Sequence, residues 1–297
     1  MDKLRIAVAG YGNTGKAAVE AVLAAPDMEL AGVVRRDAAP APELYFTKIV
    51  SDIGELGKID AALLCSPTRS FRDYALKFLK LGINTVDSYD DHTSVYEYMT
   101  ELDSAAKRNG AVAVVAAGWD PGGDSVVRAL FGAMAPRGIT HTNFGPGMSL
   151  GHTAVAKAVE GVADAMSVTV PKGEGLHRRM VYVKPKDGFC RDTIEKKIKE
   201  DPSFSHDETY VIITDDVRAL ADRGHAVSIV RKGVSGETDN QLFELRMKMS
   251  GPALTGQILA ACARAAAKRE PGAYTMIELP VIDLLPGNRE DLIRKLV

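Results

Sequence analysis

Short apolar runs alternate with helix-like stretches through the first 118 residues, and this alternation narrows the possible folds more than any other feature. Each apolar run has the length of a strand buried on both faces, which is typical of a parallel sheet. The runs are Leu4–Ala9, Leu30–Val34, Ala61–Cys65, Asn84–Asp87 and Val112–Ala117. Between them, apolar residues recur at helical spacing, as they do over Phe71–Leu79. Repeated strand–helix–strand units of this kind predict a doubly wound α/β domain.

A glycine-rich turn directly follows the first predicted strand. Its residues are Gly10, Tyr11, Gly12, Asn13, Thr14 and Gly15, and a predicted helix over Lys16–Ala25 comes next. In a strand–turn–helix context this spacing is typical of dinucleotide binding. Gly10 permits the tight turn, Gly12 lets a pyrophosphate approach the backbone, and Gly15 allows close helix–strand packing. The helix N-terminus then offers free N–H groups to the phosphates. A glycine-rich turn without a ligand is the alternative.

After Trp119 the segments become longer, and apolar and polar residues alternate within them. Met180–Lys184 and Leu242–Met247 show this alternation, which is typical of antiparallel strands with one exposed face. Strands are predicted at Thr140–Phe144, Ala165–Val170, Arg178–Val183, Tyr210–Thr214, His225–Arg231 and Gln241–Met249. Helices are predicted after Pro121, over Asp192–Glu200 and, last, over Ala253–Lys268.

The predicted fold class is therefore α/β, with three parts. Residues 1–118 form a Rossmann-like doubly wound parallel sheet that binds a dinucleotide. Residues 119–250 form a second, α+β domain with a mixed, mostly antiparallel sheet. Residues 251–297 form a C-terminal segment that packs back on the Rossmann domain. The length of 297 residues agrees with two domains.

The overall charge gives no reason to expect nucleic acid or a membrane as a partner. Lys and Arg number 37, and Asp and Glu number 39, which leaves a net charge of -2. No apolar run approaches the roughly 20 residues of a membrane span. The three cysteines, Cys65, Cys190 and Cys262, show neither a disulfide framework nor metal-ligand spacing. We expect a soluble, cytoplasmic protein that holds no metal and acts on a small molecule.

The end of the second predicted strand indicates which dinucleotide binds. NAD sites usually carry an acidic residue there for the ribose hydroxyls, whereas this chain has Arg35 and Arg36, with Asp37 only after them. Two guanidinium groups can hold a 2′-phosphate and stack on the adenine. The residues favour NADP over NAD, and a solvated basic turn is the alternative.

Polar and glycine-rich segments follow the later predicted strands, where ligands bind in doubly wound sheets. The cofactor candidates in these segments are Ser66, Pro67, Thr68, Ser88, Gly118, Pro121 and Gly122. Asp90 and Asp120 lie in the same segments, and together they could hold a substrate ammonium and help it lose a proton. A carbon next to nitrogen gives up hydride readily only when the amine is neutral. Capping of the following helix is the alternative for each aspartate.

The sequence resembles the meso-diaminopimelate dehydrogenases over nearly its whole length. The resemblance rests on several segments that are not common to all Rossmann proteins. They are residues 10–13 (GYGN), 33–36 (VVRR), 85–90 (TVDSYD), 117–122 (AGWDPG), 143–149 (NFGPGMS), 232–236 (KGVSG) and 274–280 (YTMIELP). The resemblance implies an NADP-dependent enzyme that reversibly deaminates the D-centre of meso-diaminopimelate to L-2-amino-6-oxopimelate and ammonia. It also implies a homodimer built through the second domain.

The resemblance assigns roles to individual residues. It gives Asp90 and Asp120 the reacting amine, with Trp119 as a wall of that pocket. It places Phe144, Met148, Leu150 and Gly151 around the substrate chain and its near carboxylate. It gives the distal carboxylate, on the L-configured centre, to Thr169, Arg179 and His225. His152 and His177 remain structural histidines.

One position departs from the family pattern. Gly251 stands where the family has an Asn that contacts the distal end of the substrate, and glycine offers no side-chain hydrogen bond. The loss of such a bond to a charged group weakens binding by roughly 1.5–3 kcal/mol. A broad-specificity D-amino acid dehydrogenase or a diaminopentanoate-type dehydrogenase therefore stays open as an alternative. From another class, an NADP-binding sensor without turnover is also an alternative, against which the paired aspartates weigh.

Overall fold

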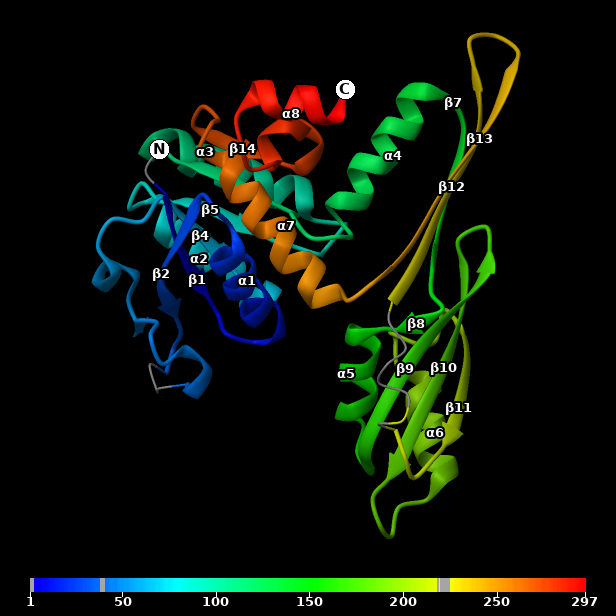
Figure 1. The fold of residues 1–297 in the computed structure, drawn as a ribbon. Helices are drawn as coiled ribbons and strands as arrows, with labels where there is room; N and C mark the ends of the chain where they lie inside the picture. The colour runs from blue at the N-terminus through cyan, green and yellow to red at the C-terminus, as the bar shows by residue number, and fades with distance from the viewer. Residues whose placement is uncertain (1–2, 38–40, 218, 220–224) are drawn as a thin grey trace. The chain divides into compact units, whose positions relative to one another are not determined.

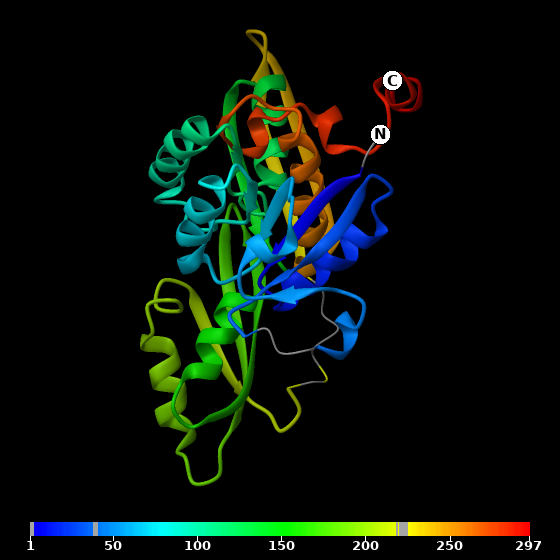
Figure 2. The same cartoon turned by 90° about the vertical axis from the view of Figure 1, so that its left-hand side faces the viewer.

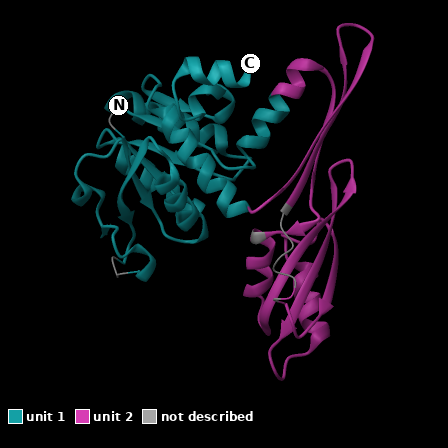
Figure 3. Cartoon of the chain, in the orientation of Figure 1, with its two compact units in different colours: residues 1–129, 251–297 teal, residues 130–250 magenta. Residues whose placement is uncertain are grey.

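The computed structural model describes residues 3–37, 41–217, 219 and 225–297. The chain divides into two compact units (Figure 3). Unit 1 contains residues 1–129 and 251–297, and unit 2 contains residues 130–250. The C-terminal segment therefore belongs to the first unit. The division falls inside helix α4 (Gly123–Met134), whereas the sequence places it at residue 118.

A parallel sheet of seven strands forms the centre of unit 1 (Figure 1). The strand order is β14-β6-β5-β4-β1-β2-β3, and every neighbouring pair is parallel. The strands are β1 (Leu4–Ala9), β2 (Met28–Val34), β3 (Ile49–Val50), β4 (Ala61–Leu64), β5 (Asn84–Asp87), β6 (Val112–Val114) and β14 (Gly272–Tyr274). Every residue of β4 and β6 is buried, and such apolar strands with both faces covered explain why the sequence pattern could predict this sheet.

Helices cover both faces of this sheet, as the view in Figure 2 shows. On one face, α1 (Asn13–Ala24) and α7 (Gly251–Ala266) share a core with β1, and on the other face α2 (Phe71–Leu79) and α3 (Val95–Asn109) share a second core. Helix α3 ends at its C-cap residue Gly110, whose φ of 64° is the left-handed conformation that glycine adopts easily. These elements confirm the predicted doubly wound α/β domain.

Helix α7 brings the C-terminal segment onto the first unit. Its Arg264, 6% exposed, makes a two-pronged ion pair with Asp27 in the turn before β2, with N···O distances of 2.5 and 2.7 Å. At Gly256 a Cβ would lie 2.6 Å from the backbone of Ala17, so α7 and α1 cross at backbone contact. The chain ends with a further helix, α8 (Arg289–Leu296), which the sequence analysis does not predict because none of its residues is buried.

Unit 2 contains two sheets, whereas the sequence predicts a single mixed sheet. One has the order β11-β10-β9-β8 and the other β13-β12-β7, and only β10 and β11 pair in parallel. The strands are β7 (Arg137–Phe144), β8 (Gly147–Met148), β9 (Val162–Gly173), β10 (Leu176–Pro185), β11 (Glu208–Ile213), β12 (His225–Ser235) and β13 (Asp239–Met249). The chain passes from one sheet to the other at Gly145, whose φ of +97° ends β7.

Two helices, α5 (Leu150–Ala158) and α6 (Arg191–Glu200), pack on one face of the four-stranded sheet. They share a core with Val181 and Val183 of β10 and with the fully buried Phe204. The sequence analysis predicts α6 but not α5, which lacks a side-chain N-cap and contains Gly151 in its first turn. The mixed, mostly antiparallel character of the second domain is confirmed.

Candidate active site

In the glycine-rich turn, Gly10 and Gly15 lie too close to neighbouring backbone atoms for any side chain to fit. Gly10 has a φ of +102°, and a Cβ there would lie 2.7 Å from the backbone of Cys65. A Cβ on Gly15 would lie 2.2 Å from the carbonyl oxygen of Gly10. Gly12, by contrast, has no heavy atom within 4 Å of where its Cβ would be. The first and third glycines therefore allow the turn and the helix packing, while the open side of Gly12 gives a ligand access to the backbone.

Helix α1 begins at this turn without a side-chain cap. Gly12 is its N-cap residue and makes no side-chain cap hydrogen bond, and the first intrahelical bond runs from the Lys16 N–H to the Gly12 carbonyl at 2.9 Å. The first-turn N–H groups at Asn13, Thr14 and Gly15 are therefore available to a phosphate. Lys16 lies 5.5 Å from the centre of the Tyr11 ring and pairs with Glu43 at 2.7 Å. This donor set fits a dinucleotide pyrophosphate.

Arg35 and Arg36 directly follow β2, next to the glycine turn. Val34, the last residue of β2, accepts a hydrogen bond from the Gly10 N–H at 2.8 Å, and the Arg35 N–H bonds to Val50 at 3.0 Å. Arg35 is half-buried and Arg36 is exposed. The backbone therefore places Arg35 and Arg36 at the strand end beside the turn, where the adenosine ribose of a bound dinucleotide is expected.

Hydrogen bonds join the loops that follow β4 and β5. The Thr68 hydroxyl donates to the carboxylate of Asp90 at 2.8 Å, and the hydroxyl oxygens of Ser66 and Ser70 are also 2.8 Å apart. The structure thus brings together the predicted residues Ser66, Pro67 and Thr68 with Asp90, which is exposed.

The segment Gly118–Gly122 forms a tight loop after β6. The Gly118 N–H donates to Pro121, and a Cβ on Gly122, whose φ is +140°, would lie 2.1 Å from the Gly118 carbonyl oxygen. A Cβ on Gly118 would lie 3.3 Å from Ser88, so this loop adjoins the one after β5. The loop presents Trp119, whose indole N–H is buried and has no partner in the part of the chain that the structure describes.

Beneath this loop lies a carboxylate that the sequence analysis missed. Asp124, in the first turn of α4, is fully buried, and its side chain lies 2.5 Å from Arg128. Asp120 is hydrogen-bonded to Asp124 and lies 3.6 Å from the same arginine. Burial raises the pKa of Asp124 to about 7, with the hydrogen bond and the charge of Asp120 acting in the same direction and Arg128 opposing them. The spacing of four residues between Asp124 and Arg128 was the available signal.

The two predicted catalytic aspartates follow neighbouring strands. Asp90 follows β5 and Asp120 follows β6, which pair in the sheet. Among the contacts described for them, none joins the two carboxylates directly.

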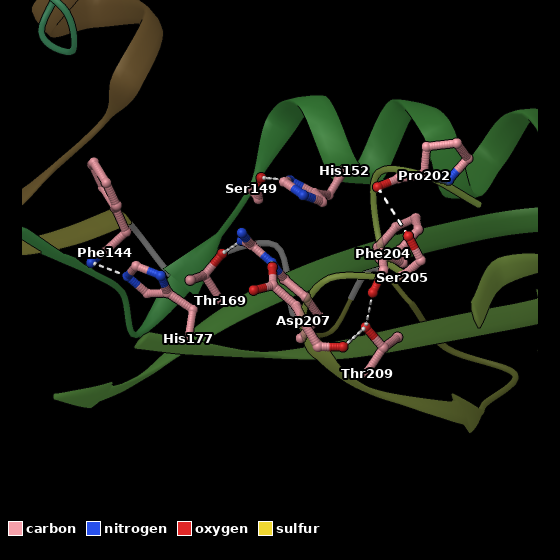
Figure 4. Close-up of polar contacts among 11 residues, drawn as sticks. Phe144, Ser149, His152, Thr169, His177, Pro202, Phe204, Ser205, Asp207 and Thr209 are labelled. Atoms are coloured by element: carbon pink, nitrogen blue, oxygen red, sulfur yellow. Dashed lines mark hydrogen bonds and ion pairs between the residues drawn. The ribbon is translucent and has the colours of Figure 1, made fainter. Parts of the chain in front are cut away.

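In unit 2, Thr169 and Arg179 face each other across β9 and β10. The Arg179 Nη1 group donates to the Thr169 hydroxyl, and its Nε group donates to Asp207 at 2.6 Å (Figure 4). The resemblance assigns Thr169 and Arg179 to the same substrate carboxylate, and in the structure their side chains are in contact. Asp207 was missed, because it lies in a polar loop with no recognisable spacing to Arg179.

For the other predicted residues of unit 2, the structure describes only some of the contacts. The Phe144 N–H donates to Nε2 of His177 at 2.8 Å, which requires that nitrogen to be unprotonated. Burial, and then the charge of Arg179, lower the pKa of His177. Met148 lies in β8, and Gly151 lies in the first turn of α5, whose uncapped N–H groups could meet a carboxylate. The side chains of Leu150 and His225 lie outside the described part of the structure.

Gly251, the position that departs from the family pattern, is the first residue of α7 in unit 1. Among the described residues, no heavy atom lies within 4 Å of where its Cβ would be. The glycine therefore leaves open space rather than relieving a clash. Among the residues that the structure describes, no cluster of three or more potential metal ligands occurs, and no helix is long and apolar enough to cross a membrane.

The fold and the glycine turn define an NAD(P)-binding oxidoreductase, and comparison with known proteins agrees. Residues 4–117 match the oxidoreductase family with an NAD-binding Rossmann fold, and residues 118–251 match the diaminopimelic acid dehydrogenase C-terminal domain. The chain is 54% identical to the meso-diaminopimelate D-dehydrogenase of Bacteroides fragilis, over the full length of both. The chain belongs to the family of meso-diaminopimelate D-dehydrogenases.

Solved structures show the same relationship. A diaminopimelate dehydrogenase from Corynebacterium glutamicum, in complex with diaminopimelate, matches with a TM-score of 0.88 at 28% identity, over 100% of both chains. An engineered D-amino acid dehydrogenase bound to NADP+ matches with a TM-score of 0.82 at 27% identity, over 99% of this chain and 100% of the other.

Proposed function

We propose that this protein catalyses the reversible, NADP-dependent oxidative deamination of meso-diaminopimelate at its D-configured centre. The products are L-2-amino-6-oxopimelate and ammonia. The observation that carries the proposal is the pair of carboxylates, Asp90 and Asp120, at the ends of neighbouring strands β5 and β6, in the sheet whose β1 leads into the glycine turn. Full-length identity to the Bacteroides fragilis enzyme supports the choice of substrate.

The two carboxylates prepare the substrate amine. As an ammonium, the amine is attracted to Asp90 and Asp120, and it must lose a proton before its lone pair can assist hydride departure. Asp120 is the residue placed to take that proton, because Asp124 and Arg128 hold its carboxylate from behind. The buried indole N–H of Trp119, which has no partner among the described residues, is a further hydrogen-bond donor beside Asp120 in sequence.

A nicotinamide dinucleotide bound at the glycine turn would supply the hydride acceptor for the α-carbon, and water would hydrolyse the substrate imine to the oxo acid and ammonia. The residues of this chain contribute binding and orientation. The uncapped first turn of α1 holds the pyrophosphate, and the open side of Gly12 lets it approach. Arg35 and Arg36 hold the 2′-phosphate that distinguishes NADP from NAD. Much of the rate acceleration then comes from positioning.

We assign the binding of the distal end of the substrate to residues of unit 2. Arg179 and Thr169 are linked through a hydrogen bond, and together with His225 they bind the distal carboxylate. The first turn of α5, at Gly151, with Leu150, Met148 and Phe144 nearby in sequence, binds the near carboxylate and the methylene chain.

A second candidate function, a broad-specificity D-amino acid dehydrogenase, is favoured by one observation. The space beside Gly251 is open, so the side chain that the family uses there has no substitute at that residue. Weaker recognition of the distal centre would let simpler D-amino acids react at comparable rates.

The test is NADP+ and NAD+ reduction by the purified protein at alkaline pH, with meso-, L,L- and D,D-diaminopimelate and a panel of D-amino acids. The proposal predicts strong activity with NADP+ that is confined to the meso isomer. Comparable rates on simple D-amino acids would favour the second candidate. Tight NADPH binding without turnover of any amine would contradict both and favour a sensor.

A further inference from the structure

The pair formed by Arg179 and Asp207 lies on the face of the four-stranded sheet that carries α5 and α6. Arg179 sits in the central strand β10, and its partners in register are Thr169 of β9 and Thr209 of β11. Residues paired across neighbouring strands point to the same face of a sheet, so all three side chains meet on one surface. Figure 4 shows Thr169, Thr209 and Asp207 in this region.

The position of Asp207 is fixed by its own loop. Its N–H donates to the Phe204 carbonyl at 3.2 Å, and the Thr209 hydroxyl donates to its carbonyl, also at 3.2 Å. Phe204 anchors this loop because its ring is fully buried in the core beneath α5 and α6. Asp207 is therefore held beside Arg179 by backbone contacts on both sides.

The two charged side chains are largely withdrawn from water, and neither is saturated. Arg179 is 14% exposed and Asp207 is 25% exposed. The described contacts use Nε and Nη1 of Arg179 and Oδ2 of Asp207. Within residues 3–37, 41–217, 219 and 225–297, no hydrogen-bond partner is described for Arg179 Nη2 or Asp207 Oδ1. Neither atom is among the buried polar atoms that lack a partner, so both are open to solvent and can bind a ligand.

Two neighbouring histidines, His152 and His177, interact with the charges of this ion pair. Burial, and then the charge of Arg179, lower the pKa of both His152 and His177. His152 is engaged with the Ser149 hydroxyl at 2.8 Å, and His177 accepts from the Phe144 N–H. The surface thus presents one fixed positive and one fixed negative charge side by side.

We propose that Asp207 binds the distal ammonium of the substrate while Arg179 binds the distal carboxylate, so that the pair recognises a complete zwitterionic α-amino acid head group. This inference rests on the proposed function, because it assigns the second amino group of the same substrate. A ligand with only a carboxylate at that end would satisfy Arg179 but would meet the negative charge of Asp207. Asp207 is therefore a specificity-determining residue for substrates with an amino acid at both ends.

The decisive comparison uses two ligands that differ only at the distal centre. Meso-diaminopimelate carries the distal ammonium, and D-α-aminopimelate has the same reacting centre, chain length and distal carboxylate but lacks that ammonium. Calorimetry in the presence of NADPH gives the dissociation constant of each ligand without requiring turnover. Kinetics with NADP+ then give kcat/KM for each ligand. The variants are Asp207→Asn, which is isosteric and keeps an oxygen for Arg179, and Asp207→Ala, which does not.

Asp207→Asn is expected to weaken meso-diaminopimelate by about 10-fold or more, since a charge-assisted hydrogen bond is lost, and to leave D-α-aminopimelate unchanged or tighter. Glu208→Gln is the matched control, because it removes the same charge from the next residue, whose partner Arg178 points to the opposite face. That control should change neither ligand.

The remaining outcomes distinguish a failure of this inference from a failure of the proposed function. An equal loss for both ligands in Asp207→Asn would mean that Asp207 only orients Arg179. No loss for either ligand, or no binding of either ligand by the unmodified protein, would overturn the inference. Selective binding of meso-diaminopimelate that depends on Asp207, without turnover, would uphold the inference and contradict the proposed function.

Discussion

At the scale of single residues, the most informative side chains are carboxylates with unequal surroundings. Asp90 is exposed and accepts from a hydroxyl, whereas Asp120 stands over the buried Asp124 and near Arg128. One aspartate therefore lies exposed, and the other belongs to a cluster of two carboxyl groups and one guanidinium group. Such unequal environments are what acid–base work requires.

Replacing Asp120 by Ala should strongly reduce turnover without changing the binding of the dinucleotide. We expect kcat to fall by about 10²–10⁴-fold, which is the typical contribution of a positioned acid or base. The dissociation constant of NADPH should stay unchanged, because the first turn of α1 and Arg35 remain intact. Stopped-flow kinetics and fluorescence titration with NADPH measure the two quantities. A parallel loss of NADPH binding would show that Asp120 supports the fold rather than the reaction.

Asp124 should make the protein less stable as pH rises. Its pKa is about 7 in the folded chain against an ordinary value of 3.8, so between these pH values the folded state binds more protons than the unfolded state. The free energy of unfolding therefore falls from about pH 4 to pH 7 and then levels off. Asp124→Asn removes this dependence and keeps a hydrogen-bond donor toward Asp120.

Urea unfolding at pH 5 and pH 8 measures this effect in both proteins. The unmodified protein should lose more stability over that interval than Asp124→Asn. Asp87, whose pKa burial raises to about 6, contributes equally to both and cancels in the comparison. Identical losses in the two proteins would contradict the raised pKa of Asp124.

At the scale of elements, backbone contact between α1 and α7 holds the C-terminal segment on unit 1. Gly256→Ala should destabilise the protein by about 1–3 kcal/mol, because the added methyl meets the backbone of Ala17 and Ala18, which cannot move aside. Gly132→Ala in α4 is the matched control, since open space surrounds it, and a helical Ala stabilises by about 0.5–1 kcal/mol. Thermal and urea unfolding should show opposite signs. If both substitutions change the free energy of unfolding in the same direction, α1 and α7 are not in close backbone contact.

The loop after β2 should decide between the two dinucleotides. Simultaneous replacement of Arg35 and Arg36 by Ala is expected to raise KM for NADP+ by roughly 10- to 150-fold, because charge-assisted hydrogen bonds to the 2′-phosphate are lost. KM for NAD+, which has no such phosphate, should change little. Arg294→Ala in the exposed helix α8 serves as the control. An equal rise for both dinucleotides would place these arginines outside the 2′-phosphate site.

Local patterns account for most of unit 1 and for less of unit 2. Buried parallel strands and the glycine turn have strong local signatures, so β1 and β5 begin and end where the sequence predicts. The separation of unit 2 into two sheets depends on pairings such as β7 with β12, which join distant segments and leave no local pattern. Asp207 was missed for the same reason, since its approach to Arg179 arises from strand register rather than from spacing.

At the scale of the whole molecule, the residues proposed for the two ends of the substrate belong to different units. Unit 1 contains the glycine turn, Asp90 and Asp120, and unit 2 contains Thr169, Arg179 and Asp207. The two ends of meso-diaminopimelate differ only in configuration, so the identity of the carbon that gives up its hydride tests the roles proposed for these residues.

The most direct test uses meso-diaminopimelate labelled with deuterium at one α-carbon. Reaction with NADP+ and mass spectrometry of the reduced dinucleotide show which carbon supplied the hydride. The account predicts that deuterium from the D-configured carbon appears in the reduced dinucleotide, and that deuterium from the L-configured carbon stays in the oxo acid. Transfer of the label from the L-configured carbon would contradict the account.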